Sequence, residues 1–600
     1  MYPSKGVIMN QTPEILKKTK IVCTIGPSSE SPEILEELIK NGMNVARLNF
    51  SHGTHEEHLA KIKTIRKVRR KLNAPVAIML DTKGPEIRTG NFNVDEVFLK
   101  PDDIFTLTTR NVEGTQDIVS VSYEGLPDDV EIGSIIYIDD GLVQLEVIEI
   151  KDGTDVVCKV LNNGVLSNHK GVNLPGSKTN LPSLTPKDVD DIKFGIENDI
   201  DFIAASFVRK KEDVYDIRKV LEDHGGEHIK IISKIESQEG VDNLEEIIEA
   251  SDGIMVARGD LGVEIRTELI PIVQKEMIRK ANLAAKPVIT ATQMLDSMIR
   301  NPRPTRAETT DVANAIIDGT DCVMLSGETA GGKYPVEAVR TMRNICITTE
   351  LSDDFNKNIY ETDISALNNV TNSIARNTCD IAKELNAKAI ISCTSSGNTS
   401  RVISKFKPKT NIIAATTTAR VARQLSVVWG VYPVVIQEAS ETDELIERAI
   451  FGSMQENFVE EGDLTVVTAG IPLGISGNSN LIKVHIIGDI LTSGTGIGTK
   501  SVAGRVCLAS TKKELVEKFQ EGDILVAKFT DSDITEYIEK SSALVTEEGG
   551  LTSHTAIAAV HFGIPAVVGA NKVRDLVADG DIITVDPIGG VIYKGETKVI

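Results

Sequence analysis

The chain has 600 residues, of which 41% are hydrophobic and 25% charged, so we expect a globular protein with more than one core. Its formal net charge of −22 argues against nucleic acid or an acidic membrane surface as a partner, because both repel a negatively charged protein. The seven cysteines include no Cys-x-x-Cys pair, which favours a reduced, cytoplasmic protein. No segment is typical of a signal peptide or a membrane span, and residues 1–15 look like an N-terminal extension.

Short apolar runs, most of them followed by a helical stretch, occupy residues 16–88 and 185–355. Such runs are typical of parallel strands that are buried on both faces. Each run ends in a polar cluster, and the clusters begin at Cys23, Arg47, Asp81, Ser206, Lys234, Arg258, Thr290 and Ser326. These strand-then-helix units predict a (β/α)₈ TIM barrel of the α/β class, and the active site of such a barrel lies where its strands end.

The alternation of strands and helices is interrupted over residues 89–184, where short strands separated by Gly and Asp turns predict an inserted all-β domain. Because the insertion leaves the barrel at a strand end, we expect it to form a β-barrel lid over the active site. After the barrel, residues 356–489 have the pattern of a smaller α/β domain. Residues 490–502 are rich in Gly, Ser and Thr and predict a linker, and residues 503–600 form a separate small domain.

Two carboxylates, Glu236 and Asp260, end neighbouring predicted strands of the barrel. Such a pair can hold one Mg²⁺ ion, which takes one or two carboxylates and completes its shell with water and substrate oxygens. Taken alone, such a pair is more often a structural ion pair. Lys234 lies two residues before Glu236, so the alternation of a strand points both side chains the same way. A cation beside a metal is suited to neutralising a phosphoryl group during its transfer.

Arg47 ends the second predicted strand and is a candidate phosphate clamp, because guanidinium binds phosphate oxygens bidentately. An exposed salt bridge is the alternative explanation. Gly259 and Asp260 open a predicted helix, whose free N–H groups can hold a carboxylate or a phosphate.

A further group of oxygen ligands with little combined charge comprises Asn49, Ser51, Asp81 and Thr82. One carboxylate with neutral oxygens suits a monovalent cation better than a divalent one. A polar network at the strand ends explains the same residues equally well.

Several longer segments of the chain resemble the pyruvate kinase family in order and spacing, over roughly residues 17–490. The matching segments are Thr19–Pro27, Asn44–Gly53, Leu80–Gly90, Lys170–Gly176, Ile232–Glu236, Met255–Gly262 and Ala291–Leu295. The resemblance implies transfer of the phosphoryl group of phosphoenolpyruvate to ADP in glycolysis, giving pyruvate and ATP. It also implies Mg²⁺ (or Mn²⁺) and K⁺ as cofactors and a cytoplasmic homotetramer.

The resemblance also carries over residue roles. Lys234 matches the family's catalytic lysine, Arg47 a phosphoryl-binding arginine, and Thr292 a threonine near the enolate carbon. The residues expected to bind phosphoenolpyruvate are Arg47, Lys234, Gly259, Asp260 and Thr292. Glu236 and Asp260 match the Mg²⁺ ligands, and the K⁺ ligands match Asn49, Ser51, Asp81 and Thr82. The nucleotide-side contacts match His52, Arg88 and Lys170, with Lys170 coming from the lid. Resembling enzymes that do without K⁺ carry Lys at the position of Glu86, so we expect K⁺ dependence here.

A polar loop follows a buried strand of the α/β domain and comprises Thr394, Ser395, Ser396, Gly397, Asn398 and Thr399. Its hydroxyls and N–H groups can cradle a phosphate. In resembling kinases this position binds a phosphorylated effector, which implies allosteric regulation. A polar turn that caps a helix is the alternative explanation.

Two segments of the last domain, residues 549–557 and 563–569, resemble the swivelling phosphohistidine domain of phosphoenolpyruvate-utilising enzymes. His554, at a predicted helix N-terminus, matches the phosphohistidine position. However, the Arg that usually follows this histidine is missing between Ala556 and Phe562, and no ATP-grasp partner is visible. We therefore expect a structural or regulatory module, with phosphotransfer through His554 as the alternative.

Three other functions compete with the kinase. A barrel lyase or aldolase that binds pyruvate on Mg²⁺ would not need the lid, Lys170 or the predicted monovalent-cation site. A non-catalytic scaffold would be favoured by loss of Lys234, Glu236 or Asp260, and all three are present. A phosphoenolpyruvate-dependent histidine phosphotransferase rests on His554 alone.

Overall fold

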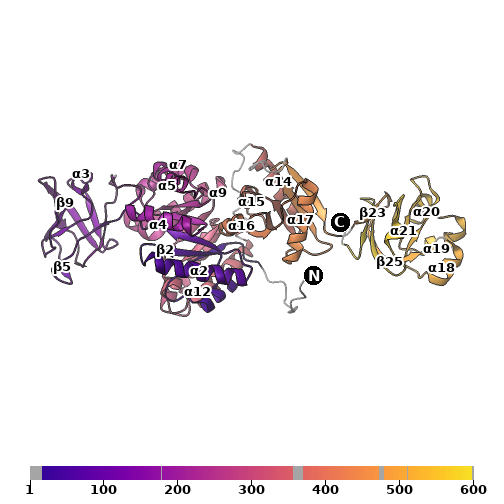
Figure 1. Cartoon of the computed structure of the whole chain (residues 1–600), viewed down its shortest axis with the longest axis horizontal. Helices are drawn as coiled ribbons and strands as arrows, with labels where there is room; N and C mark the ends of the chain where they lie inside the picture. Colours follow the sequence, from indigo (N-terminus) through magenta and orange to yellow (C-terminus); the bar gives the residue numbers. More distant parts are fainter. Residues whose placement is uncertain are drawn as a thin grey trace. The chain divides into compact units, whose positions relative to one another are not determined.

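The computed structural model describes residues 16–177, 179–353, 355, 369–471, 479–488, 490–509 and 511–597 (Figure 1). These residues form two compact units. The first contains the described residues up to 373, together with 394–408 and 416–435, and the second contains 374–393, 409–415 and the described residues from 436 onward. The predicted N-terminal extension, residues 1–15, lies outside the described part of the chain.

The first unit contains a closed barrel of parallel strands, which confirms the predicted (β/α)₈ fold. The strands are β1 (Lys20–Thr24), β2 (Val45–Asn49), β3 (Ala77–Asp81), β13 (Phe202–Ala205), β14 (Lys230–Ile235), β15 (Gly253–Ala257), β16 (Val288–Ala291) and β17 (Cys322–Leu325). They follow one another around the barrel in chain order, and β17 closes it against β1. Every residue of β1, β3 and β15 is buried, as expected for strands that are covered on both faces.

Helices follow the barrel strands along the chain. They are α1 (Pro32–Lys40), α2 (His55–Lys71), α4 (Pro186–Glu197), α5 (Lys211–Asp223), α6 (Gln238–Asp242), α7 (Leu244–Ala250), α8 (Arg258–Glu264), α9 (Ile270–Leu283), α10 (Arg306–Ile317), α11 (Gly327–Ala330) and α12 (Pro335–Glu350). Helix α4 begins where the sequence predicts, because the Thr185 side chain accepts the Asp188 N–H and the Asp188 carboxylate accepts the Thr185 N–H.

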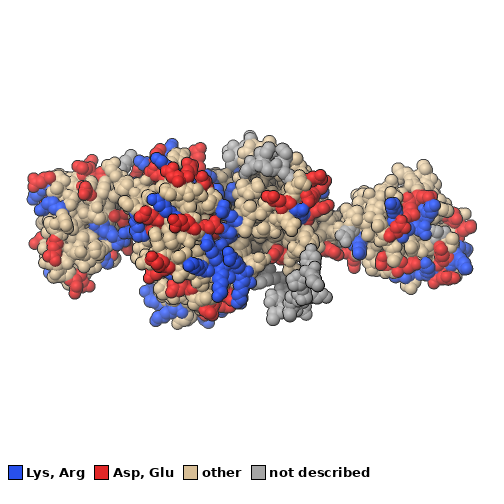
Figure 2. Space-filling model, viewed as in Figure 1, with Lys and Arg blue, Asp and Glu red and all other residues tan. Residues whose placement is uncertain are grey.

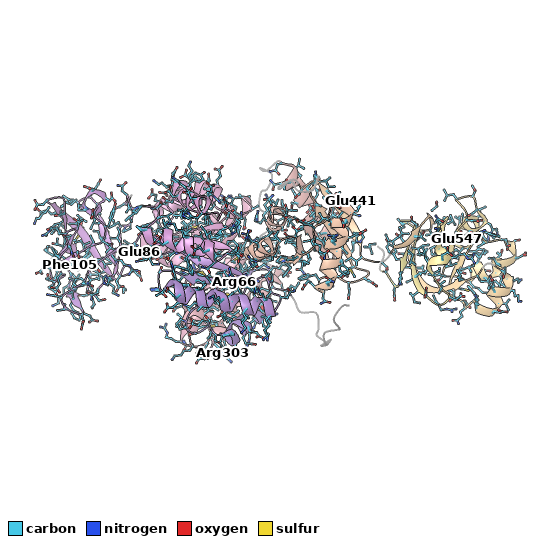
Figure 3. All side chains as sticks on the ribbon, in the orientation of Figure 1. Arg66, Glu86, Phe105, Arg303, Glu441 and Glu547 are labelled. Atoms are coloured by element: carbon cyan, nitrogen blue, oxygen red, sulfur yellow. The ribbon has the colours of Figure 1, made fainter. Side chains whose placement is uncertain are left out.

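The inserted all-β domain lies in the same unit as the barrel. Its strands are β4 (Ile87–Arg88), β5 (Val97–Leu99), β6 (Ile104–Thr108), β7 (Ile118–Ser120), β8 (Ile135–Ile138), β9 (Val143–Lys151), β10 (Asp155–Val160), β11 (Gly164–Leu166) and β12 (Gly171–Asn173). They form a seven-stranded sheet, ordered β4-β12-β8-β9-β10-β6-β7, and a two-stranded sheet of β5 and β11. An antiparallel bridge between Thr89 and Val121 joins the two edges of the larger sheet, with Gly90 N–H donating to the Ser120 carbonyl at 2.7 Å and Ser122 N–H to the Arg88 carbonyl at 2.9 Å. Phe105, labelled in Figure 3, is fully buried in the core of this domain.

The predicted α/β domain is divided between the two units. The second unit holds most of its sheet, in which β19 (Asn411–Thr416), β18 (Ala389–Cys393), β21 (Leu464–Ala469) and the antiparallel β22 (Leu481–Ile486) are neighbours in that order. The helix α17 (Thr442–Gln455) belongs to it too. The first unit holds α15 (Asn398–Ser404), α16 (Ala419–Gln424) and β20 (Val431–Val435).

Polar contacts with the barrel explain why these segments group with it. Lys18 Nζ donates to the Pro408 carbonyl at 2.9 Å, and Arg423 Nε donates to Asp201 Oδ1 at 2.7 Å. These contacts group part of the predicted α/β domain, residues 356–489, with the barrel; residues 356–368 lie outside the described residues.

The last domain is a mixed sheet with short helices. Its strands are β23 (Ile490–Ser493), β24 (Thr495–Ile497), β25 (Val502–Leu508), β26 (Ile524–Ala527), β27 (Ala543–Thr546), β28 (Ala566–Val568), β29 (Ile582–Asp586) and β30 (Val591–Lys594). Its α-helices are α18 (Lys512–Lys518), α19 (Thr535–Glu539), α20 (His554–Phe562) and α21 (Val573–Leu576).

The prediction of a linker over residues 490–502 is wrong, because β23 pairs with β30 and β24 pairs with β28. The glycines of this stretch serve close packing rather than flexibility. A Cβ atom on Gly496 would lie 1.9 Å from the Pro587 carbonyl oxygen, and one on Gly494 would lie 2.5 Å from the Val568 carbonyl oxygen.

Acidic and basic side chains are interspersed over the visible face of the molecule in Figure 2. Within the described residues, none of the helices combines the length and the apolar character that crossing a membrane requires.

Candidate functional site

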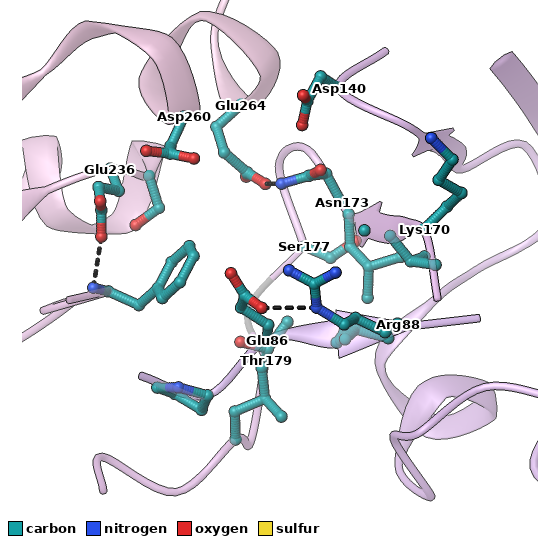
Figure 4. Close-up of a pocket in the computed structure, with 18 of the residues that line it drawn as sticks. Glu86, Arg88, Asp140, Lys170, Asn173, Ser177, Thr179, Glu236, Asp260 and Glu264 are labelled. Carbon is teal, nitrogen blue, oxygen red and sulfur yellow. Dashed lines mark hydrogen bonds and ion pairs between the residues drawn. The ribbon is translucent and has the colours of Figure 1, made fainter. Parts of the chain in front are cut away.

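A cavity of about 600 Å³ opens between the strand ends of the barrel and the inserted domain (Figure 4). The inserted domain contributes residues that include Arg88, Asp139, Asp140, Lys170 and Asn173, and the barrel side contributes residues that include Glu236, Asp260 and Glu264. The position of the inserted domain over the strand ends is that of a lid.

A cluster of buried charges lies at the ends of β2, β3 and β14. Lys234 Nζ lies 2.8 Å from Glu236 Oε1 and 3.3 Å from Asp81 Oδ1, and it donates to Ser206 Oγ at 2.8 Å. Asp81 Oδ2 accepts from Arg47 Nε at 2.5 Å. The structure thus places Arg47 in the same cluster as Lys234 and Glu236, which the sequence analysis paired by their spacing.

Neighbouring charges shift the pKa values of Lys234 and Asp81 toward their charged forms. Burial would lower the pKa of Lys234, but Asp81 and Glu236 outweigh it and raise the pKa above the ordinary lysine value. Burial would raise the pKa of Asp81, but Arg47 and Lys234 outweigh it and lower the pKa. Lys234 therefore carries a permanent positive charge at the barrel mouth.

The acidic residues around the cavity repel one another. Burial and, after it, the charge of Asp260 raise the pKa of Glu236 to about 7 against the opposing effect of Lys234. Burial and then Asp260 likewise raise the pKa values of Asp140 and Glu264. Glu236 Oε1 also receives no directed hydrogen bond, although Lys234 lies beside it. This excess of carboxylate oxygens is a donor set that a hard divalent cation fits.

Asp260 is positioned by the turn from β15 into α8. The Gly259 N–H donates to Thr292 Oγ1 at 2.8 Å, which ties the start of α8 to the end of β16. Arg258 secures the same corner by donating to the carbonyls of Ala291 and Thr292 and to Asp311. Thr292 has a φ of +66°, an unfavourable conformation for a β-branched residue that is typical of functional sites.

The four residues predicted to bind a monovalent cation follow two adjacent strands. Asn49 and Asp81 are register partners on β2 and β3. Asn49 Oδ1 accepts the Ser51 N–H at 3.1 Å, and Thr82 Oγ1 accepts the Ser206 N–H at 3.1 Å. The predicted polar network at the strand ends is therefore present.

The residues predicted on the nucleotide side are held by neighbouring acids and by the chain itself. Arg88 Nε donates to Glu86 Oε2 at 2.7 Å, and Lys170 Nζ donates to Asp139 Oδ1 at 2.9 Å (Figure 4 labels Arg88, Glu86 and Lys170). Both cations line the cavity. His52 lies in the loop between β2 and α2.

Sequence reasoning missed a contact between the lid and the barrel. Asn173 Nδ2 of the lid donates to Glu264 Oε1 of α8 at 2.9 Å (Figure 4). It also missed the Asp139-Asp140-Gly141 turn, whose residues all have positive φ. The signal in the sequence that could have identified this turn was a pair of acidic residues before a glycine in a strand-rich segment.

The predicted effector loop lies in the same compact unit as the barrel, although the sequence analysis assigned it to the separate α/β domain. Thr394 Oγ1 accepts the Gly397 N–H at 2.9 Å, and Gly397 has a φ of +80° at the start of α15. Thr394 therefore closes a polar turn directly before α15, whose N-cap residue is Gly397. Thr416, at the end of the neighbouring β19, has a buried hydroxyl with no hydrogen-bond partner among the described residues.

His554 begins α20 and is exposed. Its Nδ1 lies 2.9 Å from Thr530 Oγ1, which in turn lies 2.9 Å from Thr555 Oγ1. Val560, which is 71% exposed, stands on the stretch of α20 that lacks the expected Arg.

Family models match most of the chain. A model described as "Pyruvate kinase, barrel domain" matches residues 16–339, one described as "Pyruvate kinase, alpha/beta domain" matches residues 372–485, and one described as "PEP-utilising enzyme, mobile domain" matches residues 519–590.

Curated pyruvate kinases are similar to this chain over almost its full length. One from Staphylococcus saprophyticus is 52% identical over 98% of this chain and 100% of its own length. One from Geobacillus stearothermophilus is 51% identical over 97% of this chain and 100% of its own length. A crystal structure of a pyruvate kinase from Cryptosporidium parvum has a TM-score of 0.74 at 44% identity, covering 78% of this chain and 96% of that one.

Proposed function

This chain belongs to the pyruvate kinase family and transfers the phosphoryl group of phosphoenolpyruvate to ADP, and we propose that the charge cluster at the barrel mouth performs the transfer. The observation that carries the proposal is the convergence of Lys234 on Glu236 and Asp81, beside Arg47. In-line phosphoryl transfer needs positioning and positive charge more than covalent chemistry.

The chain's own residues supply both requirements. Lys234 and Arg47 offset the charge that spreads over the phosphoryl oxygens during transfer. Gly259, Asp260 and Thr292 orient phosphoenolpyruvate at the start of α8, while Arg88, Lys170 and His52 contact the nucleotide. The lid excludes water, which would otherwise hydrolyse the phosphoryl group.

Glu236 and Asp260 are proposed to hold Mg²⁺ or Mn²⁺, and the K⁺ ligands are proposed to be Asn49, Ser51, Asp81 and Thr82. A bound divalent cation supplies Lewis-acid charge next to the phosphoryl oxygens. The support is the excess of carboxylate oxygens around the cavity and the nearly neutral set of donors at the ends of β2 and β3.

The test is a coupled assay of ADP-dependent pyruvate formation with Mg²⁺ present, with and without K⁺. We expect activity to depend on K⁺ in the native enzyme and less so in Glu86→Lys, in which the lysine supplies the missing charge. Glu86→Gln is the matched control, since it also breaks the pair with Arg88 but adds no cation. Full activity of the native enzyme without any monovalent cation would refute the K⁺ assignment.

Phosphorylated metabolites are proposed to regulate the enzyme through residues 394–399. The support is a hydroxyl-rich turn at a helix start, together with the unpartnered Thr416 hydroxyl at the adjacent strand end. Sugar phosphates and nucleoside monophosphates are the compounds to screen for a change in the affinity for phosphoenolpyruvate. The double substitution of Thr394 and Ser396 by Ala should abolish the response, and an unchanged activation curve would place the effector elsewhere.

A cytoplasmic homotetramer completes the proposal. The seven cysteines all lie within the described residues and form no disulfide, which agrees with a reducing compartment. Sedimentation velocity measures the assembly state.

The last domain is proposed to be a structural or regulatory module. The support is that the Arg expected after His554 is missing from α20, on the stretch that carries Val560. Truncation after Gly488, which removes β23 with the rest of its sheet, should leave turnover largely intact. Incubation with phosphoenolpyruvate and Mg²⁺ should give no phosphohistidine; an acid-labile, base-stable phosphate that is lost in His554→Ala would show a second activity.

A further inference from the structure

The loop between β2 and α2, residues Phe50 to Gly53, carries two residues of the proposed site, Ser51 and His52. Its backbone N–H groups are bonded near the strand ends, since Phe50 N–H donates to the Asp81 carbonyl at 3.0 Å and His52 N–H to the Asn49 carbonyl at 3.4 Å. Side chains from two helices bind its carbonyl oxygens as well, and they do so on either side of Ser51.

His58 of α2 binds the first of these carbonyls. Its Nε2 lies 2.9 Å from the His52 carbonyl oxygen, and the residue is only 3% exposed. Its ring also stacks on Phe50, with 3.9 Å between the ring centroids and 12° between the planes. The imidazole therefore contacts the loop at both ends of the three-residue segment from Phe50 to His52.

The hydrogen bond to His52 has a defined direction. A carbonyl oxygen can only accept, so Nε2 must carry the proton. Burial lowers the pKa of His58, although the hydrogen bond to His52 opposes this shift. The lowered pKa favours the neutral ring. Nδ1 is then an acceptor, and it is buried with no hydrogen-bond partner among the described residues. Of the two ring nitrogens, only the one that faces His52 is used.

Lys187 of α4 binds the second carbonyl. Its Nζ donates to the Phe50 carbonyl at 2.8 Å and to Asp191 Oδ2 at 2.6 Å. The end of the loop is equally restricted: Gly53 has a φ of +83°, and a Cβ atom there would lie 2.7 Å from Glu57 Oε2. The path from β2 to α2 is therefore determined by side chains of α2 and α4.

We propose that His58 is a positioning residue for nucleotide binding: its Nε2–H fixes the His52 carbonyl and thereby the direction in which the His52 side chain points. The inference rests on the proposed contact of His52 with the nucleotide. His58 does not touch the substrate itself, so its loss should weaken ADP binding and leave phosphoenolpyruvate binding little changed.

Two substitutions of His58 separate its hydrogen bond from its packing. His58→Phe keeps a ring against Phe50 but has no donor, whereas His58→Gln places an amide N–H at the position of Nε2. We expect His58→Phe to raise the KM for ADP about five- to tenfold, the effect of one hydrogen bond, with less than a twofold change in the KM for phosphoenolpyruvate. His58→Gln should restore most of the ADP affinity. A role in stability alone would give neither this split between the two KM values nor the rescue.

Three further variants make each outcome decisive. His55→Phe is the packing control: His55 stacks on Phe194, lies beside Phe50 and shares Asp191 with Lys187, but it does not bond the His52 carbonyl, so its KM for ADP should rise less than that of His58→Phe. Lys187→Met removes the other anchor of the loop. Because the Lys187 side chain is half-exposed, this variant tests the same loop even if His58→Phe unfolds. It should raise the KM for ADP two- to threefold.

His52→Ala tests the assignment on which the inference rests. If His52→Ala raises the KM for ADP while His58→Phe and Lys187→Met do not, the positioning role is refuted and the nucleotide contact stands. If His58→Phe and His58→Gln raise the KM equally, the hydrogen bond is not the cause and the inference fails. If His52→Ala itself has no effect, the nucleotide assignment fails, and the role of His58 fails with it.

Discussion

The two ends of the barrel bury the same kinds of charged side chain, with opposite consequences. At the carboxyl ends of the strands, Lys234 lies between two carboxylates beside an open cavity, and its pKa is raised. At the amino ends, Lys20 of β1 donates to the Val431 carbonyl at 2.6 Å and lies over the Tyr432 ring, and burial lowers its pKa to about 7.

The difference lies in the countercharge rather than in the burial. Two carboxylates hold the Lys234 ammonium in its charged form, whereas Lys20 has a carbonyl and a ring beside it, and the like charge of Lys17 adds to the effect of burial in lowering its pKa to about 7. The carboxyl end of the barrel therefore keeps the positive charge of Lys234 for phosphoryl transfer. The base uses its polar groups to join β1 to the segment that contains β20, as expected of a barrel whose function lies at one end.

Removal of the charge at the mouth should have the largest effect. Lys234→Met should lower kcat by about 10³-fold or more, because its charge is needed most while the phosphoryl group moves between oxygens. Steady-state kinetics gives the loss, and an unchanged far-ultraviolet circular dichroism spectrum shows that the fold is retained. Turnover near the native value would remove Lys234 from the mechanism.

Breaking the ion pair at the base should affect stability instead of chemistry. Lys407 Nζ lies 2.6 Å from Asp321 Oδ1, and both side chains are almost fully buried. Lys407→Met should lower the free energy of unfolding by about 3–5 kcal/mol, because it leaves a buried carboxylate unpaired, while kcat at 25 °C stays within about twofold.

The control for this prediction is the exposed pair of Lys211 and Glu246, whose ions are 3.2 Å apart. Lys211→Met should cost less than about 1 kcal/mol in urea unfolding. Equal losses in the two variants would contradict the distinction between buried and exposed pairs.

The smallest effect should appear in the pH dependence of stability. The pKa of Lys20 is about 7 in the folded chain and 10.5 in the unfolded one, so between these values the unfolded chain binds more protons. The free energy of unfolding of the native enzyme should therefore rise by about 2 kcal/mol from pH 7 to pH 9, relative to Lys20→Met. Parallel pH profiles for the two proteins would show that Lys20 keeps its proton, contrary to the comparison of the two ends.

The sequence by itself determined the barrel, the order of its strands and the residues at their ends, because burial on both faces and the alternation of strands are properties of short segments. Lys234 and Glu236 could be paired from their spacing alone. The start of α4 could also be predicted from a short segment, because Thr185 and Asp188, which form its capping box, lie three residues apart.

Only the tertiary structure decided which distant groups meet. Gly494 and Gly496 look like a flexible linker until the carbonyls of Val568 and Pro587 are seen to leave no room for a Cβ atom. The pairing of Asn173 with Glu264 depends likewise on how the lid packs against the barrel. The bond from His58 to the His52 carbonyl spans six residues, but it depends on the turn between them and on the ring of Phe50. Hydrogen-bond geometry across a fold is set by packing, and residue type and spacing alone do not specify it.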